Sequence, residues 1–298
     1  MPRTLISLGA NLGNVRESMQ AAKRLLIDSF GSGNLLLSQL YRTPPVGGPD
    51  GQPDFLNAVA VIQTDRSVWE VWEKIKGIES ALGRQRQLRW EARRIDIDLL
   101  LYDQQRIWTP HLKIPHPRMC MRTFVVVPAL EIAPDWIDPI TLWSISKLHD
   151  HLKRSHRNNS AIRVICQDAN QLSRLQREFE ISAGHEPVNI IWCTANPMQI
   201  AENDIIENRS SPSGMTSHKL TIVAAASPDP TTVLWEDCSK PWVRALNMDT
   251  SNSIDASELR YIDGPRYLMP ADDAKWAVHE IIAADQAMQC GLEAVGEF

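Results

Sequence analysis

RWEARRIDIDLLLYD, residues Arg89–Asp103, contains the strand that decides how the first half of this chain folds. Acidic and apolar residues alternate along it, in the order Ile95, Asp96, Ile97, Asp98 and Leu99. Because side chains alternate between the two faces of a strand, both acids project from one face and the apolar residues from the other. The two carboxylates then lie roughly 6–7 Å apart, and at an effective dielectric of about 20 their repulsion costs about 2 kcal/mol. The pattern therefore predicts a strand whose acidic face needs a cation beside it.

The composition of the chain limits what kind of protein it is. Its 298 residues favour two domains, and 43% hydrophobic with 22% charged residues is typical of a globular protein. A net charge of -5 gives no indication of binding to nucleic acid or to an anionic membrane. We find neither a signal peptide nor a run of about 18 apolar residues. The five cysteines are scattered without a C-x-x-C pair, which favours a reducing cytoplasm.

Strand and helix signals alternate through the first half. We expect strands at 4–10, 34–43, 55–64 and 95–103, and helices at 14–26, 67–82 and 121–132. Asn14 with Glu17 three residues later resembles a capping box, which begins the first helix. The loop TPPVGGPDGQPD is too rich in Pro and Gly to be regular structure.

The segment HDHLKRSHRNNS marks the boundary between the halves. His149, His151 and His156 do not share one helical face, so we interpret the segment as a solvated linker helix rather than a metal site. Beyond it we expect strands at 162–168, 188–194, 219–226 and 231–235, helices ending at 183 and at 288, and a mobile loop at 207–219. Asp168, after the first of these strands, is a helix N-cap or a ligand.

The acid pair follows a cluster of arginines: Arg84, Arg86, Arg89, Arg93 and Arg94. Carboxylates can hold Mg²⁺ while arginines clamp phosphate oxygens, and acids on one face can bridge a metal pair about 3.5–4 Å apart. This combination is typical of a magnesium–nucleotide site. A sheet with one wet face beside a solvated basic loop explains the same residues without any function. Both interpretations stay open on these residues alone.

A second candidate site follows the Pro-rich loop. Phe55 and Asn57 share one face of the next strand, and Phe124 could supply the opposite wall of a slot for a flat heterocycle. His116 lies between two prolines in IPHPRM, which restrains its backbone. A proline-stiffened connector and an ordinary loop histidine are the alternatives.

Seven segments between Thr4 and Pro134 share one order and spacing with a known family: ISLGANLGN, YRTPP, PDFLNA, GIESALGR, RWEARRIDIDLL, IPHPRM and RTFVVVPALEIAP. They resemble the 6-hydroxymethyl-7,8-dihydropterin pyrophosphokinases of folate biosynthesis. The resemblance implies a ferredoxin-like α+β sandwich. It also implies transfer of pyrophosphate from ATP to the hydroxymethyl oxygen of the pterin, leaving AMP, with two magnesium ions.

The resemblance also implies roles for individual residues. Asp96 and Asp98 are the implied metal ligands and, with Arg84 and Arg93, the implied catalytic residues. The implied pterin contacts are Thr43, Pro44, Val46, Phe55, Asn57 and Phe124. The implied ATP contacts are Glu79, Arg84, Trp90, Arg93, Leu99, His116 and Arg122.

Some positions depart from the family pattern. The opening turn reads G-A-N for the usual G-S-N, and the loop from Arg84 to Trp90 is one residue shorter. Glu91 and Ala92 replace a Gly-Pro pair, so we expect Glu91 to affect loop geometry and rate. His111 stands where some relatives carry an arginine toward ATP. None of these changes removes a metal ligand or a pterin wall.

We therefore expect a catalytic domain at 1–156 and a second α/β domain at 157–298, with a mostly parallel sheet and no P-loop. The second domain is expected to serve oligomerisation, regulation or a protein partner. The expected substrates are ATP and the pterin, with no nucleic acid and no membrane. Alternatives for the first domain are a silent nucleotide-binding scaffold and another two-metal phosphoryl or nucleotidyl transferase.

Overall fold

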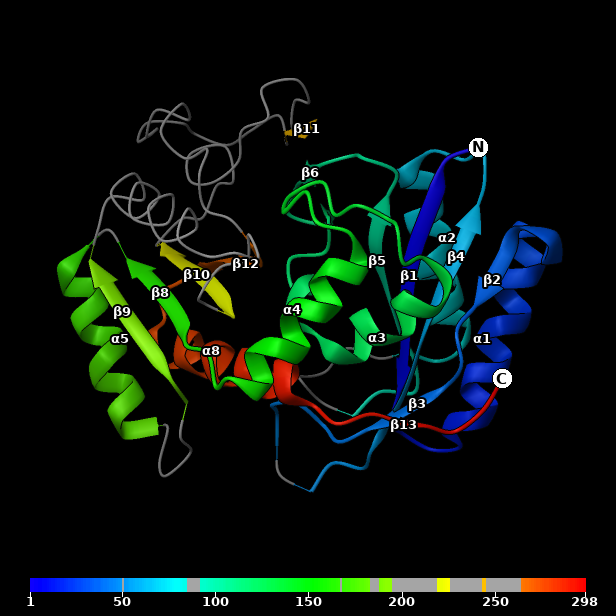
Figure 1. Ribbon diagram of the computed structural model, residues 1–298. Helices are drawn as coiled ribbons and strands as arrows, with labels where there is room; N and C mark the ends of the chain where they lie inside the picture. The colour runs from blue at the N-terminus through cyan, green and yellow to red at the C-terminus, as the bar shows by residue number, and fades with distance from the viewer. Residues whose placement is uncertain are drawn as a thin grey trace.

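The computed structural model describes residues 1–49, 51–84, 92–166, 168–182, 188–194, 219–225, 243–244 and 264–298. Two larger sheets organise these residues, one in each half of the chain (Figure 1). The first is antiparallel and the second is parallel, so the chain is a mixed α/β protein. No helix in the described ranges is long and apolar enough to span a membrane.

The first sheet has the strand order β13-β3-β4-β1-β5, with β2 also paired to β4. Its strands are β1 (Arg3–Ala10), β2 (Leu35–Leu37), β3 (Tyr41–Thr43), β4 (Phe55–Gln63), β5 (Asp96–Tyr102) and β13 (Glu293–Ala294). The expected continuous strand at 34–43 is wrong. The ladder is broken at Ser38, whose hydroxyl accepts the Val59 N–H at 3.0 Å. Leu40, which lies between β2 and β3, donates its N–H to the Gly296 carbonyl rather than to β4.

Two helices cover one face of this sheet, α1 (Val15–Phe30) and α2 (Val68–Ala81). Asn14 caps the first helix by accepting the Glu17 N–H, and Ser67 begins the second with a complete capping box. One apolar cluster joins the helices to the sheet and includes Leu26, Ile75, Ile97 and Leu99. The apolar face of the IDIDLL strand is therefore the face that packs on the helices, as its alternation predicts.

The opposite face of the first sheet packs on α3 (Thr123–Ile132), which follows a 3-10 turn at Met119–Met121. The next helix, α4 (Ile145–Arg157), packs on α3. The prediction of a solvated α4 is wrong for one of its faces. His151 is only 2% exposed, and its Nε2 lies 3.0 Å from the Lys219 carbonyl oxygen. The helix thus packs between the halves of the chain.

The second sheet has the parallel order β12-β10-β8-β9. Its strands are β8 (Ile162–Cys166), β9 (Ile190–Thr194), β10 (Leu220–Ala225) and β12 (Arg266–Pro270), accompanied by α5 (Ala169–Ser182) and α8 (Ala274–Gln289). A parallel sheet confirms the expectation for the second half. The expected strand at 231–235 and the loop at 207–218 lie outside the described residues.

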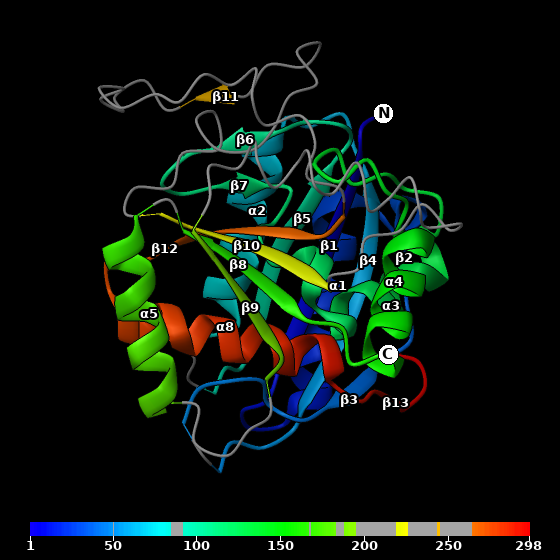
Figure 2. The same cartoon turned by 60° about the vertical axis from the view of Figure 1, so that its left-hand side comes forward.

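The two halves are joined by more than the connecting chain. One large apolar cluster contains Leu100 of β5, Val125 of α3, Ile222 of β10 and Ile281 of α8. After α8 the chain returns to the first sheet, where β13 pairs antiparallel with β3 (Figure 2). A small third sheet consists of β6 (Ile107–Trp108), β7 (Lys113–Ile114) and β11 (Val243–Arg244). The division at residue 156 stays a prediction.

Candidate functional site

The register of three neighbouring strands places the polar residues of the site in one row. Gly9 of β1 is opposite Asn57 of β4 on one side and opposite Asp96 of β5 on the other. One position pair further, Ser7 is opposite Asp98. Since strands lie about 4.8 Å apart, Asn57 and Asp96 are roughly 10 Å apart across the sheet. A small residue between them leaves room for a ligand over the row.

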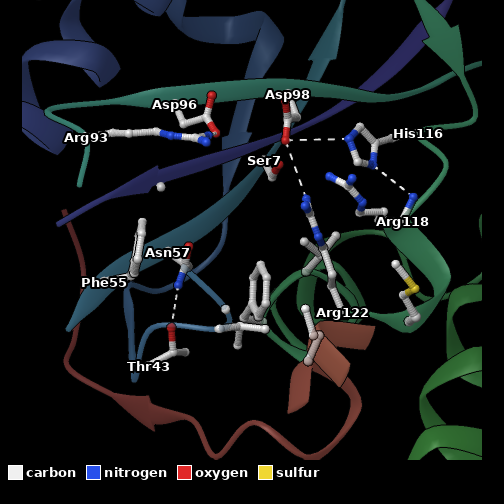
Figure 3. A pocket seen from close by; sticks show the side chains of 18 of the residues that line it. Ser7, Thr43, Phe55, Asn57, Arg93, Asp96, Asp98, His116, Arg118 and Arg122 are labelled. Atoms are coloured by element: carbon white, nitrogen blue, oxygen red, sulfur yellow. Dashed lines mark hydrogen bonds and ion pairs between the residues drawn. The ribbon is translucent and has the colours of Figure 1, made fainter. Parts of the chain in front are cut away.

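A first cavity of about 260 Å³ lies over this row. All of the residues expected to contact the pterin line it: Thr43, Pro44, Val46, Phe55, Asn57 and Phe124. Asn57 is only 7% exposed, and its Nδ2 donates to the Thr43 hydroxyl at 2.8 Å (Figure 3). This bond fixes the plane of the carboxamide. The cavity is therefore an aromatic slot with one oriented amide at its edge.

Two arginines lie against the first acid of the pair. Arg84 and Arg93 both form ion pairs with Asp96. Arg84 also pairs with Glu79, a buried acid whose Oε1 accepts the Ile97 N–H at 2.8 Å. Arg93 is held through its backbone, because its N–H donates to the Asn11 side chain at 2.7 Å. The cations required beside the acidic face are thus supplied by the expected arginines.

The second acid lies in looser contact with its neighbours. Asp98 is 3.5 Å from the Arg122 guanidinium and 3.7 Å from Nε2 of His116 (Figure 3). Both separations exceed a normal hydrogen-bond length of about 2.7–3.2 Å. His116 Nδ1 accepts the Arg118 backbone N–H at 3.2 Å, so in the neutral ring Nε2 carries the proton and points toward Asp98.

Burial lowers the pKa of His116 well below its usual value, and the positive charges of Arg122 and Arg118 lower it further. Burial likewise lowers the pKa of Arg122, with the neighbouring Arg118 cation acting in the same direction. The imidazole therefore stays neutral near pH 7, with its Nε2 proton directed toward Asp98 but beyond hydrogen-bond distance.

A second cavity of about 720 Å³ adjoins the first, and Asp98 lines both of them. It shares Arg84, Asp98, His116 and Arg118 with the first cavity. The expected ATP contacts Glu79 and Leu99 line it as well, and so does His111. The shared residues form a charged junction between the aromatic slot and the larger second cavity.

The acid pair fits a magnesium site by the chemistry of its donors. Asp96 and Asp98 are hard oxygen ligands on one face of β5, and Mg²⁺ commonly takes one or two carboxylates with phosphate and water oxygens. Among the described residues, no group of three or more His, Cys, Asp or Glu could hold a metal. Two carboxylates leave the remaining positions around such an ion to phosphate and water oxygens.

The two cavities together are lined by every described residue expected to hold the metal or to contact the pterin or ATP, whereas Arg94 and Asp168 line neither of them. Arg86 and Arg89 lie outside the described residues. Trp90 and Glu91 lie outside the described residues. Sequence reasoning missed several residues of the two cavities: Ser7, Gln52, Arg118, Tyr267, Trp276 and Glu280. Arg118 could have been found within the IPHPRM segment, whereas Tyr267 and Glu280 carry no local signal.

Comparison with known proteins agrees with this geometry. The sequence model of the family 7,8-dihydro-6-hydroxymethylpterin-pyrophosphokinase (HPPK) matches residues 5–134. A Haemophilus influenzae protein named 2-amino-4-hydroxy-6-hydroxymethyldihydropteridine pyrophosphokinase is 39% identical over 134 residues, covering 45% of this chain and 83% of that protein. A Pseudomonas aeruginosa protein of the same name is 38% identical over 137 residues, covering 45% and 82%.

Among solved structures, the Plasmodium falciparum HPPK-DHPS wild type is similar with a TM-score of 0.39 and 13% identity. That likeness covers 76% of this chain and 65% of the other, so the chain spans just under two thirds of its length. The sequence matches to the pyrophosphokinases are far closer. On the strength of those matches, the chain belongs to the 7,8-dihydro-6-hydroxymethylpterin-pyrophosphokinase family.

Proposed function

We propose that this chain transfers pyrophosphate from ATP to the hydroxymethyl oxygen of 6-hydroxymethyl-7,8-dihydropterin, as a step of folate biosynthesis. The products are the pterin diphosphate and AMP. The observation that carries the proposal is the row of Asn57, Gly9 and Asp96 across three strands. It joins a heterocycle slot to an acid pair surrounded by arginines, within the length of one pterin and its phosphates.

The pterin is assigned to the first cavity. Phe55 and Phe124 form its walls, and the oriented Asn57 carboxamide reads the edge of the ring. Thr43 holds that carboxamide, while Pro44 and Val46 line the same cavity. This placement directs the hydroxymethyl group toward the acids on β5.

ATP is assigned to the second cavity and the junction. Glu79, Leu99 and His116 line that cavity, and Arg84, Arg93 and Arg122 supply positive charge at the phosphates. Trp90 is assigned to ATP by the family resemblance alone. The pterin oxygen forms a bond to the β-phosphorus, and the bond from this phosphorus to the α,β-bridging oxygen breaks. AMP leaves with that oxygen, and the hydroxyl proton is lost to solvent.

The contribution of the protein is positioning and charge neutralisation, as in other phosphoryl-type transfers. Without ATP, Arg84 and Arg93 neutralise Asp96. When the nucleotide binds, its phosphates compete for these guanidiniums. Asp96 and Asp98 are then free to hold magnesium, for which we propose two ions. Magnesium would neutralise phosphate charge and favour loss of the hydroxyl proton.

We also propose a ferredoxin-like arrangement for the first unit. In support, the chain runs β1, α1, β3, β4, α2, β5, and the sheet order β3-β4-β1-β5 puts the first strand between the third and the last of that series. The buried cysteines Cys120, Cys166 and Cys290 are free thiols, which supports a cytoplasmic location. Self-association or a protein partner for residues 157–298 stays a prediction.

The test is release of AMP by the full chain with ATP, millimolar Mg²⁺ and the pterin, followed by chromatography. Asp96→Ala should reduce the rate at least about 100-fold, because a charge-stabilising group of the transition state is lost. Asp28→Ala, which alters an exposed acid on α1, should keep the wild-type rate. Near wild-type activity of Asp96→Ala, or AMP formation that does not require the pterin, rejects the proposal.

A further inference from the structure

Both cavities of the site receive walls from the second half of the chain. Glu280 and Ala284 of α8 line the first cavity, and Tyr267 of β12 with Trp276 of α8 line the second. All of these residues lie beyond the family match, which ends at residue 134. The site is therefore built by two parts of the chain that are distant in sequence.

Three hydrogen bonds join Arg118, Tyr267 and Glu280 in a closed ring. Arg118 donates through Nη2 to Glu280 Oε1 at 2.7 Å and through Nε to the Tyr267 hydroxyl at 3.3 Å. The Tyr267 hydroxyl donates in turn to Glu280 Oε2 at 3.0 Å. Glu280 is only 1% exposed. A carboxylate this deeply buried is stable only when it is paired and hydrogen-bonded, and here both of its oxygens have partners.

Arg118 lies at the junction of the two cavities, where the proposed function places the triphosphate of ATP. It lines both cavities together with His116 and Asp98, while its backbone N–H donates to His116. Burial lowers the pKa of Arg118, but the Tyr267 hydroxyl and the Glu280 carboxylate outweigh that effect and raise it above its usual value. The guanidinium thus remains a cation although it is largely enclosed.

We propose that Glu280 and Tyr267 are positioning residues of the second half of the chain, which hold Arg118 at the junction so that it binds the triphosphate of ATP. A guanidinium that is already fixed loses less side-chain entropy when phosphate binds. The second half therefore sets the affinity for the nucleotide. This inference rests on the proposed function and extends it to residues outside the family match.

The experiment compares two buried carboxylates of the same helix. Glu280→Gln keeps the shape of the side chain and removes its charge. Asp285→Asn does the same to an acid that pairs with Lys219 and accepts Gln289 Nε2 at 2.7 Å, away from both cavities. For each variant we measure thermal unfolding, kcat and KM for both substrates. Calorimetry then gives the Kd of α,β-methylene ATP with Mg²⁺.

Glu280→Gln should raise the Kd of the analogue and the KM for ATP about fivefold, because a charge-assisted hydrogen bond is roughly twice as strong as a neutral one. The kcat and the KM for the pterin should stay within about twofold, a split that a general loss of packing does not produce. Asp285→Asn should lower the unfolding temperature and leave the Kd unchanged. Tyr267→Phe should shift the Kd in the same direction as Glu280→Gln.

Arg118→Ala tests whether Glu280 acts through this guanidinium. The Kd of Arg118→Ala should not rise further when Glu280→Gln is added, since the two residues belong to one unit. A Kd for Glu280→Gln equal to or tighter than wild type, or an additional loss in the double variant, overturns the inference. Because the Kd needs no turnover, it decides this point even if the wild-type chain forms no AMP, a result that would reject only the proposed function.

Discussion

At the scale of single residues, Gly9 lies between the heterocycle slot and the acid pair. It faces Asn57 on one neighbouring strand and Asp96 on the other. A Cβ atom at this position would lie 2.9 Å from the Asn57 Oδ1. The carboxamide has little freedom to move away, because Thr43 holds its Nδ2. A glycine is therefore required at position 9 because the Asn57 side chain lies close to its backbone, and not because the chain turns there.

Gly9→Ala should accordingly raise the KM for the pterin roughly fivefold, the effect of about 1 kcal/mol lost at one hydrogen-bonding group. The KM for ATP should change little. Gly77→Ala is the matched control, since Gly77 lies on the exposed side of α2 with nothing within 4 Å of the added Cβ. It should stabilise the fold by up to about 1 kcal/mol and leave both KM values unchanged. An unaltered pterin KM for Gly9→Ala would contradict the assignment of Asn57.

His116 gives the fold a pH dependence whose sign follows from its lowered pKa. Below the ordinary histidine pKa of about 6.5, the unfolded chain takes up a proton that the folded site rejects. The free energy of unfolding should thus fall as the pH drops from about 7 to 5, with a slope of at most about 1.4 kcal/mol per pH unit from this residue. The contribution is fully present above pH 6.5 or so.

Urea unfolding of His116→Gln measures this contribution. The difference in free energy of unfolding between the wild type and this variant should shrink as the pH falls through that range. Parallel pH profiles for the wild type and His116→Gln would show that the site accepts the proton after all.

At the scale of elements, local signals were sufficient for α2, which has its own cap and one apolar face. The sequence alone defines α2 by its cap, Ser67, and by the apolar stripe of Val71, Ile75 and Ile78. The structure contains this helix. The same holds for β5, whose two faces meet different environments. The type and the orientation of both elements follow from residues that are close together in the sequence.

Elements whose surroundings come from distant parts of the chain could not be predicted in this way. The polar stretch around His151 reads as solvated, yet the carbonyl of Lys219 and the ring of Trp143 enclose it. Likewise, the interruption between β2 and β3 depends on the Gly296 carbonyl, which only the returning C-terminal segment supplies. Glu280 looks like any surface acid of an amphipathic helix until Arg118 is placed against it.

At the scale of the whole molecule, the first unit depends on the second for burial. Val125 of α3 and Leu148 and Leu152 of α4 belong to an apolar cluster that is completed by Ile222 and Ile281. Removing the second half would expose them. Each uncovered side chain of this size costs about 2 kcal/mol, and β3 would lose its pairing with β13 as well.

A fragment of residues 1–156 should therefore unfold at least about 10 °C below the full chain, or fail to fold, since 1 kcal/mol shifts the midpoint by roughly 2–8 °C. Differential scanning calorimetry and gel filtration of both proteins measure this. If the fragment folds, the loss of Tyr267 and Glu280 should still leave it with weaker nucleotide binding. If the fragment and the full chain have equal unfolding temperatures and equal kcat values, the second half contributes neither to stability nor to turnover.

The alanines of α8 on the cavity wall have a consequence for selective inhibition. Ala283, Ala284 and Ala287 face the slot without filling it, and they lie beyond the region matched to the family. A compound with a pterin-like ring and a compact apolar extension toward α8 would gain contacts with residues outside that match. Such a compound would distinguish this enzyme from a relative that resembles it only over residues 5–134.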